Sequence, residues 1–270
     1  MKTGIRKIYV CFPGGKHKAL TMSYDDGKHE DRRLVEIFNR HGIKGTFNLN
    51  SGLEGDPVRI PQAEYRELYR GHEVACHTVS HPTIGRCPLA SVAQEILEDR
   101  KRLEGIMGYP VRGLAYPNGS YTQEICDLLP GLGIRYGRIV GNSDGFALPE
   151  DFRQWKATCH HDHRLLELGE QFVALQKKQY LYLMYVWGHS YEFANNDNWN
   201  VIEDFCRMAG GRDDIWYATN IQIADYMDAA GMAQFAADGS FVRNPCAQSL
   251  WLRVDDERVV EVKGGEQVSL

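Results

Sequence analysis

The chain has 270 residues, of which 43% are hydrophobic and 25% charged, and its formal net charge is -5 at pH 7. This length and apolar content suffice to bury a large core in one domain. The negative charge, without a basic run, argues against nucleic acid as a partner, and no stretch approaches the ~20 apolar residues of a membrane span.

The start of the chain and its cysteines favour a cytoplasmic protein. Residues 1–7 lead into a short strand at 8–12 without the apolar core or cleavage site of a secretion signal. The seven cysteines are odd in number and lack the spacing of a disulfide framework. We therefore expect a cytoplasmic location and no disulfide bonds.

Short strands alternate with helices along most of the chain. Residues 13–15 (Pro-Gly-Gly) are expected to turn a first hairpin into a strand at 19–24, and a helix with one apolar face follows at 31–40. Further strands are expected at 45–50, 73–77, 112–116, 136–140, 180–187 and 215–217, and the clearest further helices at 88–107 and 198–209. This repetition predicts an α/β fold, a parallel (β/α) barrel with its chemistry at the carboxyl ends of the strands.

The pattern changes near residue 232. Apolar residues then alternate with polar ones at 240–243, 249–254 and 258–262, separated by turn residues. We therefore predict a barrel domain over 1–232 and a small antiparallel β extension over 233–270, which is too short to stand alone and should pack on the barrel.

Two carboxylates and two histidines follow predicted strands in the first third of the chain. Asp25 and Asp26 precede Gly27, and His77 and His81 stand four residues apart. Alone, the first pair is also a common turn signal, and the second is typical of a solvated helix face. Together they offer one carboxylate and two imidazoles for a metal with open positions, and a second carboxylate as a base. This combination indicates metal-assisted hydrolysis.

A third motif runs from Arg112 through Tyr116 to Pro117, again at a short apolar strand. With the motifs at 24–27 and 77–81, it resembles the polysaccharide deacetylase family, the carbohydrate esterases that include chitin and peptidoglycan deacetylases. The resemblance covers roughly residues 18–230 and implies a distorted seven-stranded (β/α) barrel, which agrees with the strands counted above.

The resemblance also implies roles for individual residues. It assigns a divalent metal to three side chains, Asp26, His77 and His81. Asp25 would be the general base that activates metal-bound water, and Arg112 would pair with it and lower its pKa. The backbone N–H of Tyr116 would help to stabilise the oxyanion. A plain structural ion pair is the alternative for Arg112.

The family's general acid is a histidine after a late strand, which here indicates His189 beyond the strand at 180–187. A loop histidine that only makes a hydrogen bond is the alternative. The family's Asp that orients this histidine has no clear counterpart, and Glu192 is our hypothesis for that role. The departure suggests a divergent subgroup whose substrate need not be a long polysaccharide.

The segment 159–163 (Cys-His-His-Asp-His) is a further candidate site. Adjacent residues of an extended chain point in opposite directions, whereas good zinc sites draw ligands from separated positions. We expect His160 or His161 at the rim of the site, if functional, rather than as metal ligands.

Aromatic residues near the expected mouth are candidates to stack on a sugar, although core packing also explains each of them. The candidate substrate-binding residues are Tyr24, Tyr116, Trp187, Tyr191 and Trp216.

We therefore expect a metal-dependent hydrolase that removes N- or O-acetyl groups from a carbohydrate, with an acetylated sugar or oligosaccharide as its partner. Zn²⁺ is the expected metal, with Co²⁺, Ni²⁺ or Fe²⁺ as alternatives. One competing hypothesis is hydrolysis of a non-sugar amide by the same groups. Another is a catalytically silent carbohydrate-binding protein, against which the retained Asp25 speaks.

Overall fold

The computed structural model describes residues 6–270. The expectation that no leader is present rests on residues 1–7, of which 1–5 lie outside the described residues. Nine strands of the described part form one sheet in which every paired strand is parallel to its neighbour. They are β2 (Lys18–Asp25), β3 (Gly45–Leu49), β4 (Glu73–Cys76), β5 (Gly113–Ala115), β6 (Tyr136–Asn142), β7 (Trp155–Ala157), β8 (Cys159–His160), β9 (Tyr182–Gly188) and β10 (Ile215–Tyr217).

The sheet closes into a barrel through one interrupted strand. Its order is β7-β6-β5-β4-β3-β2-β9-β8, with β10 beside the first half of β2. β7 pairs with β6 and β8 pairs with β9, and only Thr158 separates β7 from β8. Counted as one strand, β7 and β8 complete a seven-stranded ring within residues 6–270, which confirms the predicted fold class. This closing strand was absent from the strands predicted by sequence.

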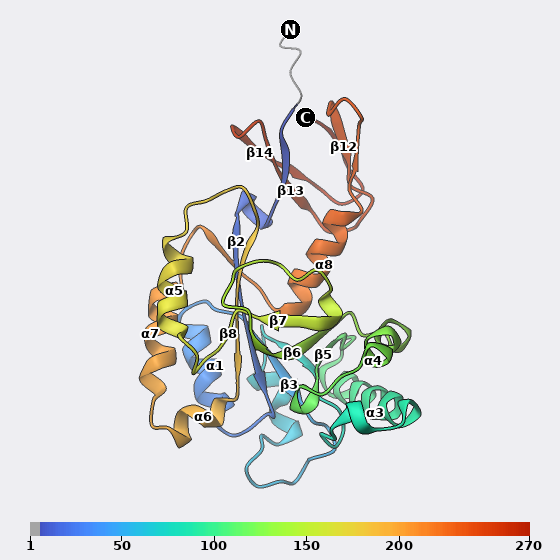
Figure 1. The fold of residues 1–270 in the computed structure, drawn as a ribbon, viewed down its shortest axis with the longest axis vertical. Helices are drawn as coiled ribbons and strands as arrows, with labels where there is room; N and C mark the ends of the chain where they lie inside the picture. The colour runs from blue at the N-terminus through green and yellow to red at the C-terminus, as the bar shows by residue number, and fades with distance from the viewer. Residues whose placement is uncertain (1–5) are drawn as a thin grey trace.

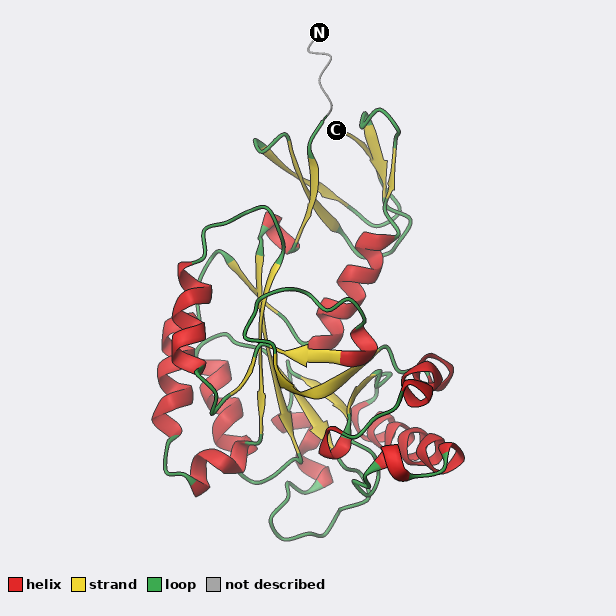
Figure 2. Cartoon of the chain, viewed as in Figure 1, coloured by secondary structure: helices red, strands yellow, loops and turns green. Residues whose placement is uncertain are grey.

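Helices surround the barrel (Figures 1 and 2). The helix α1 (Asp31–Arg40) has the predicted bounds and buries Leu34, Ile37 and Phe38 against the sheet. The other helices are α2 (Tyr65–Leu68), α3 (Leu89–Met107), α4 (Gln123–Leu128), α5 (Leu165–Ala174), α6 (Ser190–Asn195), α7 (Trp199–Ala209) and α8 (Asn220–Gly231). Within residues 6–270, none of these helices has the length and apolar character that crossing a membrane requires.

The strand directions bring Asp25, His77 and His189 to one face. All eight residues of β2 are buried, as expected for a parallel strand covered on both sides, and the strand ends at Asp25. His77 directly follows β4, and His189 directly follows β9. Because parallel barrel strands all point the same way, these residues meet at the carboxyl face.

A β appendage lies at the opposite end of the barrel, at the top of Figure 1. It contains β11 (Gln234–Phe235), β12 (Phe241–Arg243), β13 (Leu250–Val254), β14 (Arg258–Val262), β15 (Gln267–Ser269) and also the N-terminal β1 (Ile8–Cys11). The predicted hairpin between the first two strands is wrong, because β1 pairs antiparallel with β13 and only the Phe12–Lys16 bridge closes the turn. A domain boundary near residue 232 remains a prediction.

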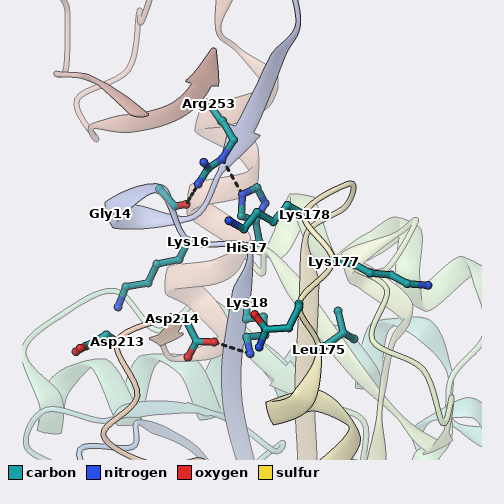
Figure 3. Close-up of a pocket in the computed structure, with 12 residues that line it drawn as sticks. Gly14, Lys16, His17, Lys18, Leu175, Lys177, Lys178, Asp213, Asp214 and Arg253 are labelled. Atoms are coloured by element: carbon teal, nitrogen blue, oxygen red, sulfur yellow. Dashed lines mark hydrogen bonds and ion pairs between the residues drawn. The ribbon is translucent and has the colours of Figure 1, made fainter. Parts of the chain in front are cut away.

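Polar and charged side chains gather at the start of β2, and one of their contacts reaches the appendage (Figure 3). Arg253 of β13 donates from Nε to Nε2 of His17 at 3.0 Å, and Lys18 Nζ lies 2.7 Å from Asp214 Oδ2. A cavity of about 260 Å³ lies among these residues. Since Lys18 begins β2 and Asp25 ends it, this cavity is at the far end of the barrel from the catalytic candidates.

The seven cysteines are all free, and five of them are buried. We expect every thiol to be alkylated in denatured protein that has seen no reductant, because no pair is bonded. Mass analysis after alkylation provides the check, and a pair that reacts only after reduction would contradict the expectation.

Candidate metal centre and catalytic groups

Two histidines and a carboxylate come together at the carboxyl face of the barrel. Ligand atoms of Asp26, His77 and His81 lie within 4.8 Å of one another. Asp26 follows β2 and the histidines follow β4, two strands separated in the sheet only by β3. Two imidazole nitrogens and one carboxylate oxygen suit a divalent transition metal with open positions.

His77 is held in the form that binds a metal. Its Nδ1 donates to the carbonyl oxygen of Ala115 at 2.8 Å, which leaves Nε2 as the free nitrogen. Its backbone N–H lies 3.0 Å from Oδ2 of Asp99 and donates to it. Burial lowers the pKa of His77 to about 4, so the ring is neutral near pH 7. The residues present therefore fit a metal.

Asp25 is a buried carboxylate with two polar partners. Its side chain accepts a hydrogen bond from Asn48 Nδ2 at 2.8 Å on Oδ1, and the guanidinium of Arg138 pairs with Oδ2. Burial alone would raise the pKa of Asp25, but the surrounding charges and hydrogen bonds, with the charge of Arg138 the largest of them, lower the pKa to about 2. The carboxylate therefore stays ionised at neutral pH.

The prediction that Arg112 pairs with Asp25 is wrong. Arg112 pairs instead with Asp225 of α8, and both side chains are 37% exposed. The reason is its position, because Arg112 precedes β5 and so lies toward the opposite end of the barrel. Arg138 of β6 is level with Ala115 at the carboxyl end of β5, which brings it to Asp25.

The expected oxyanion role of Tyr116 also fails. Its backbone N–H donates to the carbonyl oxygen of Arg138 at 3.1 Å, so it is not free for a substrate oxygen. Its ring is 1% exposed, and its hydroxyl donates to the carbonyl oxygen of Arg153 at 2.7 Å. Tyr116 therefore joins strands and loops and does not face a substrate.

His189 faces Asp25 from the other side. Its Nε2 lies 3.9 Å from Asp25 Oδ2, and its Nδ1 lies 3.2 Å from Oε1 of Glu192. Glu192 also accepts from the backbone N–H of His189 at 3.1 Å. Burial lowers the pKa of His189, but Glu192 and Asp25 outweigh this effect, and the net shift is upward. The geometry supports the hypothesis that Glu192 orients His189.

Glu192 is also the neighbour of the histidines at 160 and 161. Nε2 of His160 and Nε2 of His161 each lie 3.2 Å from Oε2 of Glu192. With Asp162, these side chains are close enough together to surround a cation. However, Nδ1 of His160 accepts from the backbone N–H of Asp162 at 3.2 Å, so a neutral ring carries its proton on Nε2. That tautomer donates to Glu192 and does not bind a metal through Nε2.

Two of the predicted substrate-binding aromatics are placed where a substrate at the mouth does not reach them, one by burial and one by its position along the barrel. Tyr24 is fully buried in the core, where its ring stacks 5.8 Å from that of His161. Trp216 of β10 is level with Ala19, near the start of β2, and packs against Phe12. Both positions contradict a contact with substrate at the carboxyl face.

The other two aromatics stay close to the catalytic candidates. The ring of Tyr191 lies 5.2 Å from that of His189. Trp187 is 8% exposed, and its ring lies 4.5 Å from the guanidinium of Arg138. Contact of either ring with substrate remains a prediction.

Sequence reasoning missed Asn48 and Arg138, which hold Asp25. A signal was present, because Arg138 is the one charged residue of the segment Tyr136–Asn142, which begins as a buried strand. A charged side chain in a buried strand needs a partner of opposite charge. That requirement could have marked Arg138 as the partner of a buried carboxylate.

Comparison with known proteins gives a family match over the first half of the barrel. The sequence profile of the family described as Polysaccharide deacetylase matches residues 13–137. A chitooligosaccharide deacetylase of Rhizobium leguminosarum bv. phaseoli is 29% identical over 117 residues, which are 42% of this chain and 49% of that protein. The chain thus spans about half the length of this curated relative.

Solved structures agree with the fold over most of the chain. A candidate polysaccharide deacetylase from Mycobacterium smegmatis is 17% identical with a TM-score of 0.63, covering 82% of this chain and 94% of that one. A family 4 acetyl xylan esterase from Clostridium thermocellum, solved with a cobalt ion, is 12% identical with a TM-score of 0.51, covering 76% and 90%. At such identities the likeness concerns the fold.

The two arginine pairs should differ sharply in their contribution to stability. Arg138→Met leaves the Asp25 carboxylate buried without its cation and should cost about 3–5 kcal/mol. Arg112→Met breaks an exposed pair and should cost less than about 1 kcal/mol. Urea unfolding of both variants measures the difference. Similar losses for the two variants would contradict the assignment of Arg138 as the partner of Asp25.

Proposed function

Because its match over residues 13–137 makes the chain a member of the polysaccharide deacetylase family, we propose that it is a metal-dependent carbohydrate deacetylase that removes N- or O-acetyl groups. The observation that carries the proposal is one cluster at the carboxyl face. Asp25 Oδ2 lies 3.8 Å from Nε2 of His77, next to the metal-ligand candidates, and 3.9 Å from Nε2 of His189.

Asp26, His77 and His81 would hold the metal. When bound, a divalent ion would supply Lewis-acid activation of the acetyl carbonyl and of a water molecule. The donor set suits Zn²⁺, with Co²⁺, Ni²⁺ or Fe²⁺ as alternatives. The cobalt ion named with the Clostridium thermocellum esterase supports metal binding by proteins of this fold.

Asp25 acts as the general base in this proposal. Asn48 and Arg138 fix its two oxygens, so the carboxylate is ionised and oriented before a substrate binds. A pure binding protein has no use for a charged carboxylate held in this way at the barrel end. The arrangement thus favours hydrolysis over silent binding of a carbohydrate.

His189 acts as the general acid and protonates the departing sugar nitrogen or oxygen. Glu192 lies against Nδ1 and leaves Nε2 directed toward Asp25. The upward pKa shift of His189 favours the protonated ring that an acid needs. Glu192 itself stays charged. Burial raises its pKa, but hydrogen bonds from His160 and His189 lower it by more, so the net shift is downward.

The substrate proposed is an acetylated sugar or short oligosaccharide. The match to a chitooligosaccharide deacetylase supports the sugar, although only about half of that protein is covered. We also propose a reducing, cytoplasmic location, which the seven free thiols support.

The function is tested by acetate release from acetylated mono- and oligosaccharides, with small acetylated amides as the comparison set. Chelated protein should be inactive and should recover activity on addition of Zn²⁺ or Co²⁺. Asp25→Asn should keep the metal and lose turnover by ~10²-fold to 10⁴-fold, whereas His81→Ala should lose both. Turnover of simple amides without any release from sugars would replace the sugar proposal, and full metal content in His77→Ala or His81→Ala would refute the ligand set.

The acid role of His189 predicts a dependence on the leaving group. His189→Ala should slow release from a sugar amine by ~10²-fold or more but affect an activated aryl acetate much less, because the aryl oxygen departs without a proton. Steady-state rates with both substrates at equal metal content give the comparison. Equal losses would show that His189 serves binding or transition-state contact and is not the acid.

A further inference from the structure

Three residues in the loops that carry the metal-ligand candidates have a left-handed backbone. The φ angles are 80° at Asp26, 66° at Thr78 and 58° at His81. Residues other than glycine rarely adopt such φ angles, and they keep them only where the surrounding structure imposes them. Two of the three residues are proposed ligands, so a contact that imposes this backbone also sets the metal site.

One guanidinium reaches the first of these loops. Nη1 of Arg59 donates to the carbonyl oxygen of Asp26 and, at 3.0 Å, to Oδ1 of Asn50. The Arg59 side chain is only 11% exposed. The N–H of Asp26 donates to the carbonyl oxygen of Asn48 at 3.0 Å, so both sides of this strained residue are held.

The side chain of Asn50 reaches the second loop. Its Nδ2 donates to the carbonyl oxygens of His77 at 2.6 Å and Thr78 at 3.1 Å. Oγ1 of Thr78 then accepts from the N–H of His81 at 3.2 Å. Asn50 is 2% exposed, so water does not compete for these bonds.

The position of Asn50 and Arg59 in the fold explains why they contact both ligand-bearing loops. Both belong to the loop that follows β3, the strand that lies between β2 and β4 in the sheet. Gly52 of the same loop donates from its N–H to the carbonyl oxygen of Val79 at 3.0 Å. The loop is thus bonded to the backbone at three consecutive residues after β4 as well as to Asp26.

We propose that Arg59 and Asn50 form a clamp that positions Asp26, His77 and His81 for metal binding. The inference rests on the proposed metal site and adds two positioning residues to it. Neither side chain supplies a ligand atom, and the clamp acts by holding the backbone of both ligand-bearing loops. A preorganised site binds its metal more tightly, because less order must be gained on binding.

The charge of Arg59 gives the proposal a test that depends on sign. Nη2 of Arg59 lies 3.7 Å from Oδ1 of Asp26, so its positive charge repels a divalent cation at the site. If Arg59 had only this electrostatic effect, Arg59→Met would bind metal more tightly. If the clamp holds the ligands, the same change weakens binding.

The experiment measures Co²⁺ and Zn²⁺ dissociation constants of purified full-length variants by competition with a chelating dye. Arg59→Met and Asn50→Ala should each weaken binding by about 10- to 100-fold, the range seen for groups that orient metal ligands. The double variant should lose less than the product of the two single effects, because both act through one bridge. Arg59→Lys, which retains the charge and a donor, should recover part of the loss.

Arg66→Met is the matched control. Arg66 also donates to a backbone carbonyl oxygen, that of Ile106 at 2.7 Å, but it contacts neither ligand-bearing loop. It should bind metal as the wild type does. Thermal melting of the metal-free variants separates a loss of affinity from a general loss of fold.

Unchanged or tighter binding by Arg59→Met, in a protein whose wild type binds metal, would overturn the clamp and leave the proposed function intact. Independent, fully multiplicative effects of the two substitutions would also overturn it. If Arg59→Met fails to fold, Asn50→Ala and Arg59→Lys decide, since wild-type affinity in Asn50→Ala refutes the clamp. Absence of metal binding in the wild type would instead refute the proposed function, and with it the clamp.

Discussion

Asp25 and Arg138 face each other inside the barrel with 3% and 1% of their surfaces exposed. Removing two charges from water is costly, so a pair of this kind contributes more to orientation than to net stability. Arg138 also pairs with Ala115 of β5, accepts on its carbonyl oxygen from the N–H of Tyr116 just after that strand, and contacts the ring of Trp187 on β9. The pair therefore fixes the carboxylate relative to three other strands, and the geometry of the catalytic face depends on it.

The site residues that lie at the ends of strands could be predicted from the sequence alone. Asp25, Asp26, His77 and His81 lie at or just after the carboxyl ends of β2 and β4, and parallel strands deliver such residues to one face whatever their exact lengths. The choice between Arg112 and Arg138 depends on how far each strand is shifted along the barrel. That shift is the register between paired strands, for example the pairing of Ala115 with Arg138. No local sequence pattern indicates it.

Two features of the fold escaped prediction for related reasons. The closing strand is short and broken at Thr158. His160 was interpreted as part of a possible site in the segment 159–163 and not as a strand residue. The pairing of β1 with β13 joins Ile8 to Val254, a separation that no periodicity signals. The strand at 8–12 was predicted from its own residues, but its partner was not, and the closing strand was recognisable only through its pairing with β6 and β9.

Backbone hydrogen bonds decide which ring nitrogen of His77 and of His160 carries the proton. The carbonyl oxygen of Ala115 fixes the ring of His77, and the backbone N–H of Asp162 fixes that of His160, so each ring presents a defined nitrogen to its partner. The first ring is left with a lone pair for a cation, and the second with a proton for Glu192. Two groups of similar composition are thereby directed to different chemistry.

The pairing of β1 with β13 also has a consequence for the making of the protein. Synthesis proceeds from the N-terminus, so β1 leaves the ribosome long before β13 exists to pair with it. Until then its backbone N–H and C=O groups form an open strand edge, which other chains can also join. The sheet β1-β13-β14 can thus form only after β13 and β14 have been synthesised, and β1 stays without its partner while the whole barrel is made.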